Sequence, residues 1–428
     1  MIPLPVLVDL GDGIAAGPIT RTTDASIPPE GYRLDLEPTG IRITSSGAAG
    51  AFYAEQTLGQ LGEHPPTGVI EDHPRFAYRG AMLDVARHFL PVEAVLRYVD
   101  DIALLKLNHL HLHLTDDQGW RIEIDAYPEL TRIGGATQVG GGGGGYYTKA
   151  DYRRIVAYAA ERFVTIVPEI DMPGHTNAAI VAYPELGDEP AEPYEGIEVG
   201  FSTLAIGEES TYEFVRTVLT ELAAMTPGPY LHLGGDESFK TSDEDFLLFV
   251  RRAAELGAAT GKTVIGWHEM GRSSELPAGM VGQYWDYAVP REPAGEYTLS
   301  FVRQGGKVIL SPADRVYLDI RYTEDHPYGL VWADGPTTLP DAYDWEPTDI
   351  VPGLAEADIL GVEAPIWTET LATIEQVESM AFPRLAAVAE RAWSPRGASG
   401  LLERLPALQA VWDARGIAYH RVPEVGWA

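Results

Sequence analysis

The sequence predicts an α/β protein, a (β/α)8 TIM barrel preceded by a small α+β domain. From residue 77 onward, short apolar segments alternate with amphipathic segments, the pattern of strands joined by helical crossovers. There are eight such apolar segments, the number that closes a barrel, and charged or aromatic side chains follow each of them. We therefore assign residues 1–76 to the α+β domain and residues 77–428 to the barrel.

The α+β domain is indicated by a hairpin followed by a helix. Residues 31–36 and 40–45 alternate apolar and polar side chains and are separated by a turn, which predicts two antiparallel strands. Residues 48–63 have helical spacing, and the sequence HPPTG at 64–68 ends that helix. The first 30 residues leave room for one or two further strands.

The barrel strands are the eight apolar segments, and helical patterns separate several of them. Val215, Val218 and Leu222 are spaced as on one face of a helix. The stretches 286–306 and 312–358 are rich in Pro and Gly, so we expect the later helices to be short or missing. The predicted strands are residues 79–85, 108–114, 163–169, 230–235, 263–267, 280–285, 307–311 and 359–366.

Six consecutive glycines at 140–145 interrupt this pattern. A glycine run loses too much backbone entropy to hold a helix or strand, so we expect a surface loop. A phosphate-binding loop is the competing interpretation, but no Lys-Ser or Lys-Thr follows the run and no strand precedes it.

The composition excludes several classes of partner. The chain has 31 basic and 63 acidic residues, a net charge of −32, which disfavours nucleic acid and anionic membranes and suits a neutral or cationic ligand. It has no cysteine, which excludes disulfides, thiolate zinc sites and cysteine nucleophiles. No basic residue precedes Arg21 to form a signal peptide, so a cytoplasmic protein is expected, with a removed leader as the alternative.

Reactive side chains follow every predicted strand, and a barrel gathers such groups at one end. Carboxylates and tryptophans dominate, and together they are typical of a carbohydrate site, because indole rings stack on sugar rings and carboxylates accept bonds from hydroxyls. Two adjacent carboxyl groups in such a site tend to have different pKa values, so that one can stay protonated. The groups include Arg87, Asp116, Asp171, His175, Asp236, Glu237, Glu269, Trp285, Tyr317, Asp319, Trp367 and Glu369.

Several of these segments together resemble a known family. GAMLDVARHF (80–89), NHLHLHLTDDQGWRIEI (108–124), VPEIDMPGHTNAA (167–179), HLGGDE (232–237) and PIWTE (365–369) closely resemble the family-20 glycoside hydrolases, the β-N-acetylhexosaminidases. The resemblance extends over about residues 30–395. It implies a retaining exo-acting enzyme that removes terminal non-reducing N-acetylglucosamine or N-acetylgalactosamine from β-glycosides, without a cofactor or a metal. This family departs from the usual two-carboxylate mechanism because the substrate assists its own hydrolysis.

The resemblance also implies the role of the Asp-Glu pair. Glu237 would protonate the leaving-group oxygen and later activate water. Asp236 would bind the N–H of the 2-acetamido group, whose oxygen attacks the anomeric carbon to give an oxazolinium ion. The hydroxyl of Tyr317 would donate a hydrogen bond to that acetamido oxygen. An internal nucleophile held in place reacts with little further loss of entropy.

The remaining site residues are likewise carried over from the resemblance. The wall of the acetamido pocket would be formed by Trp267, Trp285 and Trp367, with Trp332 at its mouth. The sugar hydroxyls would be held by Arg87, Asp319 and Glu369. Two buried groups, Asp116 and His175, would support Glu237. The implied partner is an amino-sugar glycoside, either a chito-oligosaccharide or a glycoconjugate, and the oligomeric state is left open.

Three alternatives stay beside this prediction. His109, His111 and His113 alternate along one predicted strand, and we favour packing inside the barrel over a metal site because no matching ligand spacing occurs elsewhere. Asp171 either orients His175 or caps the next segment. A non-catalytic carbohydrate-binding barrel is the alternative function, although it would not need the Asp-Glu pair together with its supporting groups.

Overall fold

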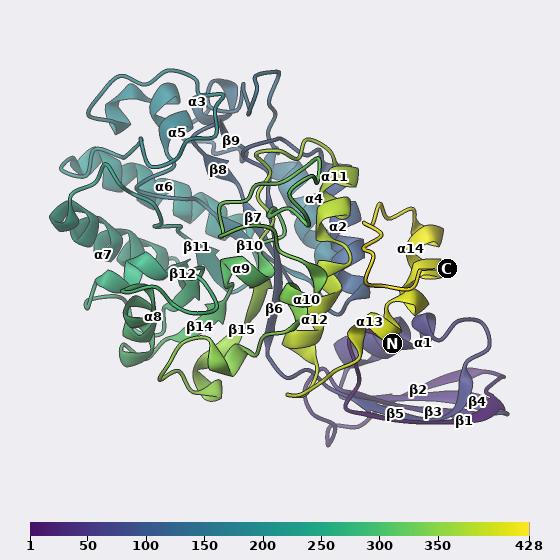
Figure 1. Cartoon of the computed structure of the whole chain (residues 1–428). Coiled ribbons are helices and arrows are strands. Elements are labelled where there is room, and N and C mark those ends of the chain that lie inside the picture. Colours follow the sequence, from purple (N-terminus) through teal and green to yellow (C-terminus); the bar gives the residue numbers. More distant parts are fainter. Residues whose placement is uncertain (428) are drawn as a thin grey trace.

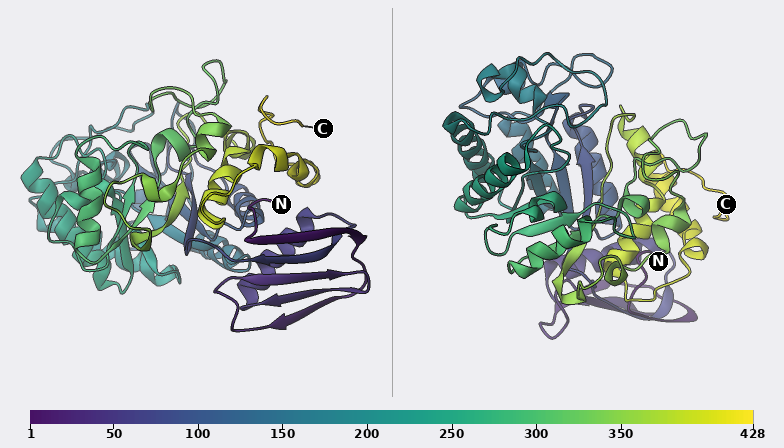
Figure 2. Two further views of the ribbon diagram at one scale, coloured as in Figure 1. Left: turned by 60° about the horizontal axis from the view of Figure 1, so that its bottom comes forward. Right: turned by 60° about the vertical axis from the view of Figure 1, so that its left-hand side comes forward.

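The computed structural model describes residues 1–427, in which a small sheet with one helix lies against an eight-stranded barrel (Figure 1). The sheet contains both the N-terminal strands and the segment that leads into the barrel. The last helices of the chain lie beside the barrel on the side of this sheet, so the two termini are near each other (Figure 2). No helix among these residues is both long and apolar enough to cross a lipid bilayer.

The N-terminal sheet has the strand order β1-β5-β3-β4-β2 within the described residues. The predicted hairpin is β3 and β4, and the predicted helix is α1. Strand β5 was not predicted, because two prolines precede or begin it and Ile70 is its only buried apolar side chain. The bounds are β1 Leu7–Ile14, β2 Ile19–Thr23, β3 Tyr32–Glu37, β4 Gly40–Ser45, α1 Ala48–Gln60 and β5 Pro66–Asp72.

Buried polar groups join the sheet to the barrel. Lys106, which follows the first barrel helix, donates to Asp72 and to the hydroxyl of Tyr32, both at 2.8 Å. The indole N–H of Trp393 donates to the same Asp72 carboxylate at 2.9 Å. Burial lowers the pKa of Lys106 below its ordinary value, although the adjacent Asp72 carboxylate opposes this change. The contact satisfies a buried charge on each side, as a stable interface requires.

The barrel is closed by eight parallel strands in the order β10-β11-β12-β13-β14-β15-β6-β7 among residues 1–427, which confirms the predicted fold class. All eight predicted segments supply one strand each. These strands are buried on both faces, and the polar side chains within them, such as the histidines of β7, are buried as well. Their bounds are β6 Tyr78–Asp84, β7 His109–His113, β10 Thr165–Glu169, β11 Tyr230–His232, β12 Thr263–Trp267, β13 Val281–Tyr284, β14 Lys307–Leu310 and β15 Ile359–Ala364.

Long helices surround the first half of the barrel, and shorter ones the second half (Figures 1 and 2). Helix α4 begins with a capping box in which Thr148 and Asp151 satisfy each other's backbone N–H groups. After β12 a single 3-10 turn replaces a helix, although this segment lies outside the two Pro- and Gly-rich stretches in which short or missing helices were expected. The crossover helices are α2 Val92–Leu104, α4 Lys149–Ala160, α6 Glu209–Met225, α7 Asp243–Ala259, η2 His268–Arg272 and α8 Ala294–Arg303.

The remaining elements lie in the loops at the barrel's ends and after its last strand. The glycine run 140–145 is in such a loop, and Gly145 leaves no room for a side chain, since a Cβ atom there would lie 2.2 Å from Phe89. The other bounds are β8 Thr115–Asp116, β9 Gly119–Trp120, α3 Glu129–Arg132, α5 Asn177–Ala182, η1 Pro184–Leu186, α9 Ala313–Val316, α10 Leu339–Tyr343, η3 Pro347–Asp349, η4 Glu356–Asp358, α11 Ile374–Ala381, α12 Arg384–Trp393, α13 Leu401–Arg404 and α14 Pro406–Arg415.

Candidate active site

A cavity of about 390 Å³ opens where the barrel strands end, a size typical of small-molecule sites. Eight of the twelve predicted site residues line it: Arg87, Asp236, Glu237, Trp285, Tyr317, Trp332, Trp367 and Glu369. The other four, Asp116, His175, Trp267 and Asp319, are buried and outside this lining. Segments from five different strand ends therefore meet at one cavity.

A strained turn places the Asp236-Glu237 pair in the cavity. Strand β11 stops at His232, and Gly234, Gly235 and Glu237 all have positive φ, at 66°, 102° and 44°. A side chain at Gly234 would place its Cβ atom 1.7 Å from Oδ1 of Asp171, so only glycine fits there. Positive φ at a non-glycine residue such as Glu237 is costly and occurs mainly at functional sites. The turn directs both carboxyl groups away from the strand.

Asp236 is a buried carboxyl group with an open hydrogen-bonding position. Its Oδ1 atom has no hydrogen-bond partner among residues 1–427. Burial, opposed by the charge of His175 and assisted by that of Glu237, raises the pKa of Asp236 to about 6. Buried acceptors are normally satisfied, so the site is built to receive a donor at this atom.

A charged histidine lies behind the pair. The Nδ1 atom of His175 is 3.2 Å from Oδ1 of Asp116, and its Nε2 atom is 3.6 Å from Oε2 of Glu237. Burial would lower the pKa of His175, but Asp116 and then Asp171 raise it well above the ordinary value. A ring nitrogen of His175 and one carboxylate oxygen each of Asp171 and Asp236 all lie within 4.8 Å of one another. Asp171, whose role the sequence left undecided, therefore lies close to both His175 and Asp236 and is itself buried.

Arg87 is held at the base of the cavity by carboxylates. Its guanidinium group is 2.7 Å from Asp116 and 3.3 Å from Asp84, and it lies 4.8 Å from the centre of the Trp367 ring. The side chain is almost fully buried. Arg87 is thus fixed in position and still lines the cavity, where it can donate to a ligand hydroxyl.

Two further carboxyl groups, one of them beside Arg87, lack donors. Both oxygens of Asp319 and one oxygen of Glu369 have no hydrogen-bond partner within the described chain. Burial and the nearby Glu369 raise the pKa of Asp319 to about 8, and burial also raises the pKa of Glu369. Together with Asp236, these groups favour a ligand that carries several hydrogen-bond donors, such as a sugar.

Aromatic rings form the wall of the cavity. The ring of Trp332 lies 6.3 Å from that of Trp285 and 5.4 Å from that of Tyr317, edge-on in both cases. Burial, followed by Asp236 and Asp319, raises the pKa of Tyr317 well above its ordinary value, so its hydroxyl stays a donor. Trp267 differs from these residues because it is fully buried, and its indole N–H donates to Glu169 at 3.0 Å.

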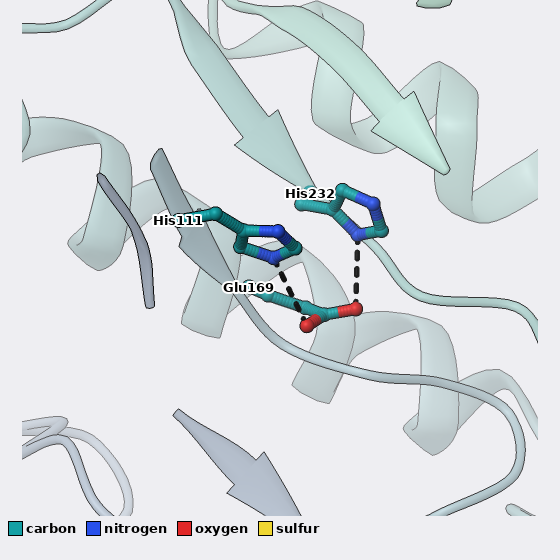
Figure 3. A group of neighbouring side chains, drawn as sticks. All are labelled: His111, Glu169 and His232. Atoms are coloured by element: carbon teal, nitrogen blue, oxygen red, sulfur yellow. Dashed lines mark hydrogen bonds and ion pairs between the residues drawn. The ribbon is translucent and has the colours of Figure 1, made fainter. Parts of the chain in front are cut away.

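The histidines of β7 lie inside the barrel, beneath the cavity. His111 and His232 both point at the carboxylate of Glu169, at 3.0 Å each (Figure 3). The other ring nitrogen of His111 is 2.9 Å from Glu363. Burial would lower the pKa of His111, but Glu363 and Glu169 raise it to about 9. Both ring nitrogens of His111 thus face carboxylates inside the barrel, the arrangement that the packing interpretation expects.

One residue of the site, Glu269, was noted after the fifth predicted strand but was given no role from the sequence. Glu269, in the turn η2, accepts the indole N–H of Trp285 with both carboxyl oxygens, at 3.0 and 2.8 Å. Burial, followed by the charge of Asp236, raises the pKa of Glu269 well above its ordinary value. In the sequence, Glu269 was marked only by its position two residues after the end of β12. Many surface acids occupy similar positions, so this position alone did not identify it.

Family models match nearly the whole chain. The model described as glycosyl hydrolase family 20, catalytic domain, matches residues 76–396, and the model for domain 2 of the same family matches residues 10–73. A β-N-acetylhexosaminidase of Cellulomonas fimi is 42% identical over 99% of this chain and 87% of its own length. A β-hexosaminidase of Porphyromonas gingivalis is 35% identical over 97% of this chain but only 58% of its own length.

Solved structures agree over the full chain. A family-20 β-N-acetylglucosaminidase is 48% identical, with a TM-score of 0.96, and the match covers 100% of this chain and 99% of that one. A mutant β-hexosaminidase of Streptomyces plicatus, solved with the product GlcNAc, is 43% identical, with a TM-score of 0.96 and coverage of 100% and 97%.

Proposed function

The chain belongs to glycoside hydrolase family 20, and we propose that its cavity binds the terminal non-reducing N-acetylhexosamine of a β-glycoside. The protein is a β-N-acetylhexosaminidase, and its hydrolysis is exo-acting, retaining and substrate-assisted, as in the family. One observation carries the assignment of the site: the unpartnered, buried Oδ1 atom of Asp236 lies next in sequence to an acid, Glu237, that lines the cavity.

In the proposed binding mode, the open acceptors of the cavity each receive one donor from the sugar. Asp236 accepts the acetamido N–H, Asp319 and Glu369 accept from the hydroxyls at C4 and C6, and Arg87 donates to those at C3 and C4. The aromatic wall of Trp285 and Trp367 packs against the acetamido methyl group and the sugar ring, with Trp332 at the mouth, and the buried Trp267 supports the wall from behind. These hydrogen bonds offset the cost of burying carboxyl oxygens that have no partner within the protein.

The chemical step then needs only two protein groups at the reacting atoms. Glu237 gives its proton to the glycosidic oxygen while the acetamido oxygen attacks the anomeric carbon and displaces the leaving group. The resulting oxazolinium ion is stabilised by the Asp236 carboxylate at its N–H, and Tyr317 holds the acetamido oxygen. Glu237 next removes a proton from water, which opens the ring with net retention.

Asp116 and His175 act from behind the reacting groups. Arg87 and His175 both contact Asp116, so this carboxylate holds the imidazolium ring in place. The positive ring near Glu237 stabilises that carboxylate after it has lost its proton. A non-catalytic sugar-binding barrel would have no use for such a proton-handling group, and the named relatives are enzymes.

The natural substrate is proposed as a chito-oligosaccharide or a glycoconjugate that ends in N-acetylglucosamine or N-acetylgalactosamine. The test is release of p-nitrophenol from the N-acetyl-β-glucosaminide and from the plain β-glucoside, by wild type and Glu237→Gln. Hydrolysis of the N-acetyl substrate alone, lost in the variant, is the expected result. Turnover of both substrates, or full activity of the folded variant, would refute the assignment.

A further inference from the structure

The residues that line the cavity form two groups of different chemistry, which we call its inner and outer halves. The inner half contains the charged groups assigned above to the terminal sugar. The outer half is lined by Ile197, Val199, Tyr287, Leu330, Trp332 and Arg291. All of these outer side chains except Arg291 are apolar or aromatic, in a chain whose net charge is −32.

Large apolar side chains are exposed around this outer half. Ile197 is 45% exposed, Val199 is 37% exposed and Trp332 is 41% exposed. Phe239, which follows the acid Glu237 by two residues, is 72% exposed and packs beside the 197–200 loop, where a Cβ atom on Gly200 would lie 2.2 Å from its ring. Single exposed apolar residues are ordinary, but a group of them around a cavity mouth indicates a binding surface.

The one charge in the outer half is already neutralised. The guanidinium group of Arg291 contacts Asp286 through Nε at 2.8 Å and through Nη2 at 2.7 Å. It also lies 3.9 Å from the centre of the Tyr287 ring, and the carboxylate of Asp334 adds to its negative surroundings. An anionic group that entered this half would lose water without gaining a free counter-ion.

We propose that the outer half is a leaving-group subsite that selects by charge. It takes an uncharged ring with an apolar face, which packs between Trp332 and the Ile197–Val199 rim, and it disfavours a leaving group with a carboxylate or phosphate. The inference rests on the proposed function, because Glu237 must protonate the oxygen that joins the two halves of the substrate. Ile197 and Val199 are then specificity-determining residues for the part of the substrate that departs.

The test compares kcat/KM for three substrates that share a terminal N-acetylglucosamine. Their leaving groups are N-acetylglucosamine, N-acetylmuramic acid, which carries a carboxylate, and methanol. The enzymes are wild type, the double variant Ile197→Ser/Val199→Ser, and the control Leu247→Ser, a 39% exposed residue on α7 outside the cavity. All three substituted positions are on the surface, so folding should be preserved.

Wild type should prefer the neutral disaccharide over the muramic acid disaccharide by roughly tenfold or more, as apolar pockets discriminate on this scale. The double variant should lose roughly tenfold on the neutral disaccharide and much less on the methyl glycoside, which has no ring to contact the rim. The control should behave as wild type.

Equal or better cleavage of the muramic acid disaccharide would overturn the proposal, and so would an equal loss on all three substrates in the double variant. Failure of wild type on every substrate, the p-nitrophenyl glycoside included, would overturn the proposed function itself and the subsite with it.

Discussion

The Nε2 atom of His175 lies 3.6 Å from the Oε2 atom of Glu237, closer than to any oxygen of Asp236. Its other nitrogen is 3.2 Å from Asp116, whose charge raises the pKa of His175 against the effect of burial. His175 therefore presents a positive charge to the acid of the reaction. This charge is of most value when Glu237 has given up its proton.

Replacing His175 by glutamine should lower kcat by roughly 10²-fold, because support of the proton-transfer group is lost. The loss should be larger for the disaccharide of N-acetylglucosamine than for the p-nitrophenyl glycoside, whose leaving group needs little protonation. The matched control is His64→Gln, an exposed histidine of the N-terminal domain. Equal losses on both substrates would indicate a structural role only.

The raised pKa of Asp236 predicts that kcat/KM falls at acidic pH. Its pKa is raised to about 6, chiefly by burial, and the proposed role requires the ionised form. Lowering the pH below about 6 protonates it, so kcat/KM should fall by about tenfold per pH unit. Asp236→Asn should remove this fall at acidic pH and lower the rate by roughly 10²–10³-fold. Measuring kcat/KM of wild type and variant from pH 4 to 8 tests this prediction. A wild-type kcat/KM that stays constant between pH 4.5 and 7 would contradict the role of the Asp236 carboxylate.

The strands and the end of the barrel that holds the site were predictable because both follow from local pattern. Parallel strands are buried on both faces, so β10 is mostly apolar, and β7 alternates leucines with histidines that are buried in the barrel. Groups just after such strands meet at one end of the barrel whatever their separation in sequence. That rule placed Arg87, Asp236 and Glu369 around one cavity without knowledge of any contact.

The contacts that orient these groups were not predictable. His111 and Glu363 pair across 252 residues, and only closure of the barrel brings them together. Trp267 is the last residue of β12 and Trp285 comes directly after β13, yet only the ring of Trp285 reaches the cavity lining and that of Trp267 is buried. The direction of a side chain at a strand end depends on the turn that follows, and neither periodicity nor composition specifies that turn.

Glu269 is expected to set the position of Trp285. Glu269→Ala leaves a largely buried indole N–H without its acceptor, at a cost of about 1–3 kcal/mol, and the loosened ring should raise KM for the p-nitrophenyl N-acetyl-β-glucosaminide. Glu269→Gln keeps an acceptor oxygen and should restore KM to near the wild-type value. Steady-state kinetics of both variants give the comparison. Equal KM values in wild type and the alanine variant would show that Trp285 is held by packing alone.

A buried pair of acids far from the site predicts how stability depends on pH. Asp101 on α2 faces Glu378 on α11, and burial together with Glu378 raises the pKa of Asp101 from 3.8 to about 8. The folded state therefore binds this proton more tightly than the unfolded chain does, so its contribution to the free energy of unfolding falls as the pH rises from about 4 to about 8. Above pH 8 the penalty is constant.

Asp101→Asn removes the titrating group and should be more stable than wild type at pH 8.5, by at least about 2 °C in Tm, with the difference shrinking toward pH 4.5. The matched control is Asp325→Asn, an exposed carboxyl group on a loop, which should follow wild type at every pH. Thermal unfolding in matched buffers measures both. A difference in Tm between Asp101→Asn and wild type that stays constant from pH 4.5 to 8.5 would mean that Asp101 holds no proton in the folded state, because only a proton bound more tightly on folding makes that difference depend on pH.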